Sequence, residues 1–199
     1  MMAALSRKVA SKLYSGGVIQ EADQELYEYA LNIALSGILH FVTCTALGAT
    51  FGLIPASLAL FISFAVIRKF AGGFHASTPL KCYLFSIVTH SLLLALVKFT
   101  PHMHPWLFCA LLLAPAPLII CLAPSYTEAK PLSTKERKVF RIVAILLYAG
   151  LAALSWCIFH FYSEQIGFSG LLGLCLEGFV LALAKIEKLL KSHRKIFDA

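Results

Sequence analysis

The sequence predicts an all-α polytopic membrane protein with about six membrane segments. Composition is the first reason: of 199 residues, 59% are hydrophobic and only 14% are charged, whereas soluble domains have about 25% charged residues. The mean hydropathy of +0.81 is the second reason. The third is that the apolar residues gather in long runs separated by short loops. Together these features exclude a disordered chain, a disulfide-stabilised miniprotein and an ordinary soluble enzyme.

Six apolar runs are candidates for the membrane segments, because a helix needs about 20 residues to cross the hydrocarbon core. They cover residues 30–53, 55–67, 79–99, 105–123, 139–161 and 166–184. The first carries no formal charge, and the second is the shortest. Pro115 and Pro117 predict a kink in the fourth. The second and fourth segments are therefore candidates for re-entrant rather than spanning segments.

We interpret residues 1–199 as one membrane domain, with a cytoplasmic arm over residues 1–29, a helical bundle over 30–185 and a basic tail over 186–199. In residues 1–13 of the arm, apolar side chains recur at helical spacing. This pattern is typical of an amphipathic helix lying on an anionic leaflet; a partly ordered terminus is the alternative. An acidic helix follows, either as a solvated face or as a contact for a basic peptide. The arm has no unbroken apolar stretch, so we expect no cleavable signal peptide.

The excess of basic residues follows the predicted membrane topology. The chain has 17 Lys and Arg against 10 Asp and Glu, a net charge of +7. All of the basic residues except Lys98 lie in the arm, the loop after the second segment, the loop after the fourth (with Arg141 just inside the fifth) or the tail (with Lys185 immediately before it). Because basic residues concentrate in cytoplasmic loops, both termini and these two loops are predicted to be cytoplasmic in a multi-pass cell-membrane protein. This alternation explains the charge without a nucleic-acid partner.

The loop of residues 68–82 combines His75 with Cys82. Such a pair can catalyse acyl transfer, because the histidine removes the thiol proton and the thiolate attacks a carbonyl. In one continuous helix, residues seven apart would be separated by about 10.5 Å along the axis, too far for proton transfer. Gly72 and Gly73 permit the backbone conformations that interrupt a helix.

Thr78 and Pro79 have the residue types of a helix N-cap and a first helical position. Cys82 is then expected in the first turn of the third segment, near the positive end of the helix dipole and beside Lys81. Both neighbours favour the thiolate. The alternative interpretation is a basic cytoplasmic turn with an incidental histidine and an inert cysteine.

The loop resembles the accessory gene regulator B (AgrB) family of membrane cysteine peptidases in Gram-positive quorum sensing. That family combines an arginine, a glycine two residues before a histidine, and a cysteine seven residues after it, which are matched here by Arg68, Gly73, His75 and Cys82. The stretch 28–31 is similar to the family's N-terminal region, although this chain has Ala30 where the family commonly has glycine.

The resemblance implies a membrane-embedded cysteine endopeptidase that needs no cofactor and acts on an AgrD-like propeptide. Cys82 is the implied nucleophile, and His75 the base that later protonates the leaving amine. Cleavage leaves an acyl-thioester on Cys82, and a Cys or Ser of the retained peptide closes a thiolactone or lactone ring, the autoinducing peptide. No third catalytic Asp or Asn stands near the pair in sequence.

Several residues are candidates for supporting roles. The N–H groups of Gly72, Gly73 or the start of the third segment can stabilise the oxyanion. Arg68 can do the same, bind a propeptide carboxylate, or anchor the loop to lipid phosphate. Glu177 lies within the sixth segment, where a carboxylate is costly, so it marks an intramembrane polar site that faces a cavity, pairs with a base, or is protonated. A structural or peptide-binding role is favoured there over catalysis.

No metal site is expected. The six cysteines show no metal-binding spacing, and His102 and His104 have no third ligand beside them in sequence. His40, His90 and His160 are interpreted as hydrogen-bonded interior histidines.

Two rival functions remain open: a small membrane transporter or peptide exporter without proteolytic activity, and a lipid-modifying enzyme. The expected partners are the propeptide, membrane lipids and a second copy in a homodimer.

Overall fold

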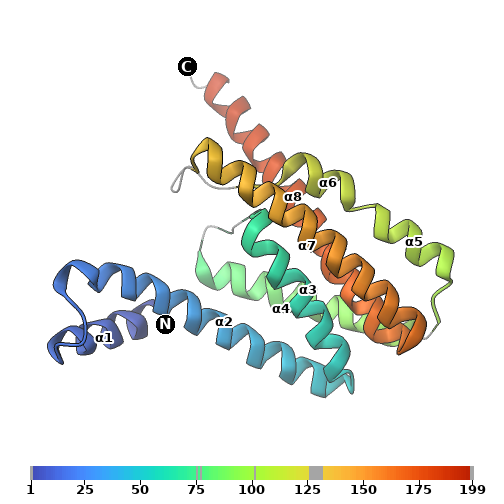
Figure 1. Ribbon diagram of the computed structural model, residues 1–199, viewed down its shortest axis with the longest axis horizontal. Helices are drawn as coiled ribbons and strands as arrows, with labels where there is room; N and C mark the ends of the chain where they lie inside the picture. The colour runs from blue at the N-terminus through green and yellow to red at the C-terminus, as the bar shows by residue number, and fades with distance from the viewer. Residues whose placement is uncertain (1, 75, 77, 101, 126–131, 198–199) are drawn as a thin grey trace. The chain divides into compact units, whose positions relative to one another are not determined.

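The computed structural model describes residues 2–74, 76, 78–100, 102–125 and 132–197, with side chains described as far as Lys191. Within these ranges the chain forms α-helices, one short 3-10 helix and no β-strand. The prediction of an all-α protein is therefore confirmed. The elements, labelled in Figure 1, are α1 (Met2–Ser15), η1 (Glu21–Asp23), α2 (Gln24–Phe51), α3 (Ile54–Ala71), α4 (Pro79–Phe99), α5 (Pro105–Leu113), α6 (Ala116–Leu122), α7 (Thr134–Phe161) and α8 (Glu164–Phe197).

Among the described residues, six helical stretches are long and apolar enough to cross a membrane, as the sequence predicts. They are Glu21–Phe51, Ile54–Ala71, Pro79–Phe99, Pro105–Leu122, Thr134–Phe161 and Glu164–Lys191. The helices extend beyond the predicted apolar runs at several ends. In particular, α8 continues to Phe197, so the expected basic tail is helical as far as that residue.

The fourth stretch is divided at the prolines, in agreement with the predicted kink. α5 ends at Leu113 and α6 begins at Ala116. Because Pro115 has no N–H group, the carbonyl of Leu111 loses its usual helical partner. The thiol of Cys175 on α8 donates to that carbonyl at 3.5 Å, and the hydroxyl of Tyr148 on α7 donates to the next one, of Leu112. Neighbouring helices thus satisfy the backbone groups that the break releases.

Helix α8 is the central helix of the bundle. Of its most apolar 18-residue window, 67% is buried, whereas no other stretch exceeds 33%. It packs mainly against α3 and α7 (Figure 1). Glycines allow this close packing: a Cβ on Gly173 would lie 2.6 Å from the carbonyl oxygen of Leu60 on α3, and one on Gly170 would lie 2.6 Å from Ser155 Oγ on α7. Small residues serve the same purpose at many membrane helix interfaces.

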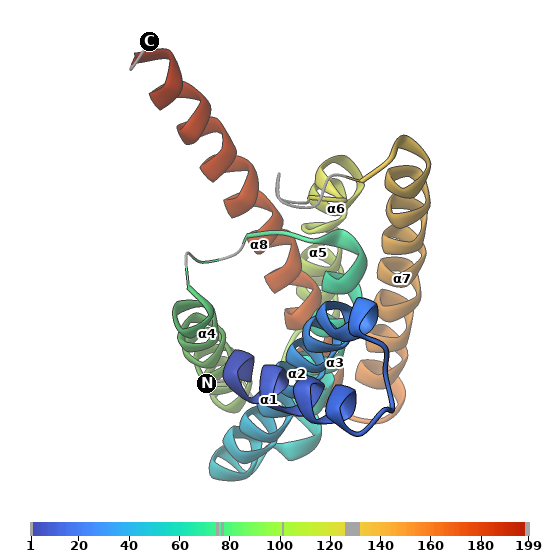
Figure 2. The same cartoon turned by 90° about the vertical axis from the view of Figure 1, so that its left-hand side faces the viewer.

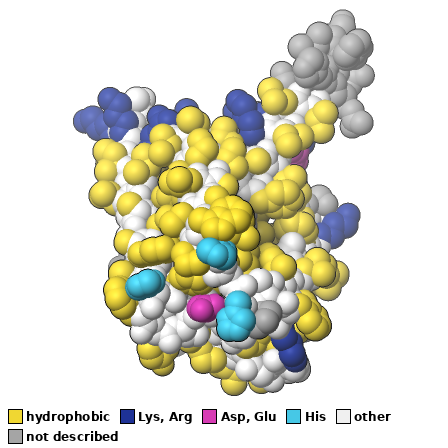
Figure 3. Space-filling view, turned by 90° about the vertical axis from the view of Figure 1, so that its right-hand side faces the viewer, with side chains coloured by type: hydrophobic (Ala, Val, Ile, Leu, Met, Phe, Trp, Pro, Cys, Tyr) yellow, Lys and Arg dark blue, Asp and Glu magenta, His cyan; other side chains and the backbone are white. Residues whose placement is uncertain are grey.

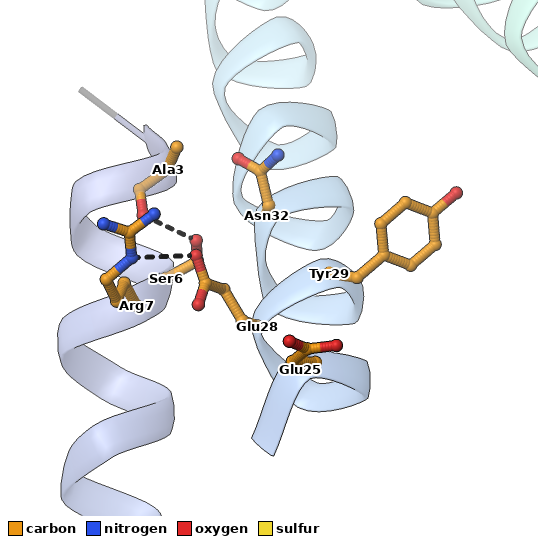
Figure 4. A pocket seen from close by; sticks show the side chains of 7 residues that line it. All are labelled: Ala3, Ser6, Arg7, Glu25, Glu28, Tyr29 and Asn32. Carbon is orange, nitrogen blue, oxygen red and sulfur yellow. Dashed lines mark hydrogen bonds and ion pairs between the residues drawn. The ribbon is translucent and has the colours of Figure 1, made fainter. Parts of the chain in front are cut away.

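The chain divides into two compact units, residues 1–43 and 44–199. In the first unit, α1 forms a hairpin with the beginning of α2, and Arg7 Nε donates to Glu28 Oε1 at 3.2 Å (Figure 4). The second unit contains the rest of the bundle and the loop of residues 68–82. The assignment of residues 1–199 to a single domain stays a prediction.

The surface is apolar where lipid is expected. Figure 3 shows hydrophobic side chains over the middle of one face, with Lys and Arg side chains toward its edges, several of them along the top. Exposed leucines lie midway along the helices, including Leu92 of α4 and Leu146 of α7. This distribution fits a multi-pass membrane protein. The cytoplasmic orientation of the termini stays a prediction.

Candidate functional site

The loop of interest leaves α3 and enters α4 with well-defined helix ends. α3 ends at Ala71, and Gly72 follows with φ +74° while its N–H group donates to Arg68 O at 3.0 Å. α4 begins at Pro79, and the extended Thr78 accepts a hydrogen bond at its side chain from the N–H of Lys81 at 3.3 Å. The predicted N-cap is therefore confirmed.

Cys82 lies in the first turn of α4, where the sequence places it. Its N–H group donates to Thr78 O at 3.1 Å, and its free thiol is half-buried. The Cys82 thiol therefore lies near the positive end of the α4 helix dipole. His75 lies outside the described residues, so its pairing with Cys82 stays a prediction.

Gly72 and Gly73 lie where the loop backbone approaches the backbone of Ser125 so closely that a side chain at Gly72 would not fit. Gly72 forms an isolated β-bridge with Ser125, which lies in the segment that follows α6. The N–H of Gly73 donates to Ser125 O at 2.9 Å, and the N–H of Ser125 donates to Ala71 O at 2.8 Å. A Cβ on Gly72 would clash with the carbonyl oxygen of Ser125. The left-handed φ of Gly72, and φ +128° at Gly73, are conformations that glycine adopts without steric cost.

The side chain of Arg68 forms hydrogen bonds with the same stretch of backbone. Its Nη1 donates to Gly72 O at 2.9 Å, and its Nη2 donates to Phe74 O. The guanidinium lies 5.6 Å from the ring centroid of Phe64, a cation–π distance. Its side chain is only 18% exposed. The contacts of Arg68 in this structure are thus with the loop's own carbonyls.

Helix α8 reaches the loop at two points, and the loop passes beside it in Figure 2. The N–H of Phe74 donates to Val180 O at 3.3 Å. One turn earlier, Glu177 is fully buried, and its Oε2 lies 3.8 Å from Arg68 Nη1. Glu177 thus lies at ion-pair distance from a basic group, which is one of the three environments that the sequence allows for it.

A family model described as Accessory gene regulator B matches residues 6–181 of the chain. The chain belongs to the accessory gene regulator B family. Membership places it among the accessory gene regulators of quorum sensing, and the matched range includes the complete loop of residues 68–82.

Curated relatives carry the same family name or a related one. Protein FsrB of Enterococcus faecalis is 25% identical over 166 residues, which cover 81% of this chain and 66% of the relative. The accessory gene regulator protein B of Staphylococcus carnosus is 28% identical, covering 68% and 71%. That of Staphylococcus lugdunensis is also 28% identical, covering 76% and 78%. The chain thus spans from just under two thirds to about four fifths of the length of these relatives. No solved structure matches it.

The histidines outside the loop have different surroundings. His90 of this AgrB member is an interior histidine, as predicted: its Nε2 lies 2.7 Å from Ser57 Oγ, and its Nδ1 lies 3.7 Å from Cys44 Sγ. Because Ser57 donates its proton to the carbonyl of Cys44, Nε2 must carry the ring proton and Nδ1 accepts from the thiol. The prediction for His160 is wrong, since this residue is exposed and stacks on Trp156 near the end of α7.

His102 and His104 do not form a metal site with described neighbours. His102 Nδ1 lies 3.5 Å from Glu164 Oε2 at the start of α8. His104 lies beside the ring of Trp106. Among the described residues, no group of three or more His, Cys, Asp or Glu side chains is arranged to hold a metal ion.

Sequence reasoning missed the roles of Ser125 and Val180. Both hold the loop through their backbone carbonyls, so the identity of their side chains gives no signal. The partnership of Arg68 and Glu177 had a partial signal, because Glu177 is the only acidic residue in the sixth apolar run.

Proposed function

We propose that this AgrB family member is a membrane-embedded cysteine endopeptidase that cleaves an AgrD-like propeptide and cyclises the retained part into an autoinducing peptide. The observation that supports this proposal most directly is the position of Cys82. Its thiol is half-buried in the first turn of an N-capped helix, directly after a loop that Arg68, Ser125 and Val180 hold in place.

In the proposed reaction, Cys82 is the nucleophile and His75 the general base. His75 takes the thiol proton, and the thiolate attacks the carbonyl carbon of the scissile peptide bond. The tetrahedral intermediate then collapses, the C–N bond breaks, and His75 returns the proton to the leaving amine. The C-terminal part of the propeptide departs, and the retained part stays on Cys82 as a thioester.

The second half of the reaction closes the ring. A Cys thiol or Ser hydroxyl within the retained peptide loses its proton to His75 and attacks the thioester carbonyl. Cys82 leaves as a thiolate, which recovers the proton from His75, and the product is a thiolactone or a lactone. Exchange of one thioester for another conserves the acyl activation, whereas water would destroy it. This route requires a site that limits the access of water to the thioester.

The start of α4 is the best-supported candidate for stabilising the oxyanion. The N–H groups of Gly72 and Gly73 already donate to Arg68 O and Ser125 O. Both Nη atoms of Arg68 donate to loop carbonyls. The positive end of the α4 dipole, by contrast, lies at the turn that carries Cys82. A developing negative charge on the substrate oxygen is stabilised at such an end.

The proposal is tested by co-expressing the protein with its propeptide and analysing the peptide products by mass spectrometry. We expect Cys82→Ala and His75→Ala to abolish cleavage. Cys157→Ala, which removes an exposed thiol from α7, is the matched control and should leave cleavage unchanged. A processed propeptide with Cys82→Ala would refute the peptidase assignment. An acyl-enzyme trapped on Cys82 supports the cyclisation route, and its absence under single-turnover conditions argues against that route.

A further inference from the structure

Glu177 is a buried carboxylate that the proposed reaction does not use. Its side chain is fully buried on α8, and neither carboxylate oxygen has a hydrogen-bond partner among the described residues. A carboxylate in such surroundings is costly unless an opposite charge accompanies it. An ionised Glu177 at this position therefore needs a nearby cation.

Arg68 supplies that cation at 3.8 Å, measured from Nη1 to Oε2 of Glu177. This separation is an ion pair without a direct hydrogen bond, because the guanidinium directs its N–H groups elsewhere. Nη1 donates to Gly72 O and Nη2 to Phe74 O. The carboxylate of Glu177 is thus positioned as a counter-charge to the guanidinium, whose hydrogen bonds are made to the loop carbonyls.

The backbone at Gly73 packs closely against the side chain of Arg68. A Cβ on Gly73 would clash with Nη1 of Arg68 and lie 3.0 Å from Val180 Cγ1, so the backbone at Gly73 rests directly on both side chains. Val180 follows Glu177 by one turn of α8 and also accepts the hydrogen bond from the N–H of Phe74. α8 therefore reaches the loop at two successive turns. The carboxylate of Glu177 lies beside the Arg68 side chain, and the carbonyl of Val180 accepts from the backbone N–H of Phe74.

We propose that Glu177 is a positioning residue: its carboxylate orients the Arg68 guanidinium toward the carbonyls of Gly72 and Phe74, and thereby fixes the backbone that leads into His75. This inference rests on the proposed function for its effect on catalysis. Its effect on the loop backbone is independent of that function, because the hydrogen bonds of Gly73 and Phe74 exist whatever reaction the loop supports.

Glu177→Gln tests the proposal, because it keeps the shape of the side chain and removes its charge. Loss of a partner that orients a metal ligand costs about 10- to 100-fold in activity, and we apply the same scale to a charge that orients a guanidinium. We expect kcat for propeptide cleavage to fall by about that factor, with KM unchanged, since the contact of Glu177 is with Arg68 of the loop. Glu177→Asp keeps the charge on a side chain one methylene shorter and should recover part of kcat.

Glu164→Gln is the matched control, because it removes a carboxylate from the same helix at a partly exposed position. It should leave kcat and KM unchanged. All variants are compared at equal amounts of folded protein in detergent or nanodiscs, so that a folding defect is not counted as a loss of catalysis.

Hydrogen–deuterium exchange provides a measurement that does not depend on activity. The amide protons of Gly73 and Phe74 are bonded to Ser125 O and Val180 O, and we expect their exchange to accelerate in Glu177→Gln and not in Glu164→Gln. Unchanged exchange together with unchanged kcat would overturn the proposal, and so would a raised KM at unchanged kcat. If Cys82→Ala still yields processed propeptide, the proposed function fails, whereas the exchange result continues to decide the role of Glu177.

Discussion

Replacing Gly72 by alanine tests whether the loop of residues 68–82 needs the backbone conformation seen in the structure. Gly72 has φ +74°, and a Cβ there would clash with the carbonyl oxygen of Ser125. That oxygen belongs to the backbone, so it can move only if the segment of Ser125 moves. The move would break the hydrogen bonds from Gly73 N to Ser125 O at 2.9 Å and from Ser125 N to Ala71 O at 2.8 Å.

The magnitude follows from these contacts. The conformation of Gly72, with φ +74° and ψ −143°, costs a residue with a side chain about 1–3 kcal/mol. Each of the two broken hydrogen bonds adds about 1 kcal/mol. The sum of about 3–5 kcal/mol corresponds to a fall of about 100- to 5000-fold in the equilibrium constant for forming the ordered loop. If that loop is the active form, propeptide processing falls by a similar factor.

The assay is the initial rate of propeptide cleavage in membranes, normalised to the amount of folded protein. Gly150→Ala on α7 is the control, because a Cβ at Gly150 would meet no atom within 4 Å. It should retain the original rate. A Gly72→Ala variant that cleaves within threefold of the unmodified protein would show that the loop does not need this backbone conformation.

Three further substitutions address the helix packing and the start of α4. Gly173→Leu places a side chain against Leu60 O, where even a Cβ would lie at 2.6 Å, and should lower the amount of folded protein and its melting temperature. Thr78→Ala removes the N-cap of α4 and should destabilise that helix end by about 1 kcal/mol, which reduces cleavage severalfold, while Thr78→Ser should cleave normally. Ser57→Ala removes the acceptor for His90 and the donor for the carbonyl of Cys44; it should cost about 1–3 kcal/mol of stability, with cleavage per folded molecule unchanged. An unaltered melting temperature for Gly173→Leu or Ser57→Ala, or full cleavage by Thr78→Ala, would contradict the corresponding contact.

Local features of the chain were predictable because they depend on residues close together in sequence. Thr78 and Pro79 begin α4 as expected, since the cap and the fixed φ of proline act within one turn. The break between α5 and α6 follows from the missing N–H of Pro115. His160 was predicted wrongly because periodicity alone does not show which side of α7 faces its neighbours, and this residue is exposed.

The sequence by itself therefore determined the apolar helices, the break at the prolines, the start of α4 and the position of Cys82 within its first turn. Only the tertiary structure decided what holds the backbone before His75. Ser125, Val180 and Glu177 are distant from that loop in sequence, and two of them act through main-chain carbonyls that every residue possesses. Contacts of this kind leave no mark in composition, spacing or periodicity, since they arise only when α3, α8 and the segment after α6 pack together.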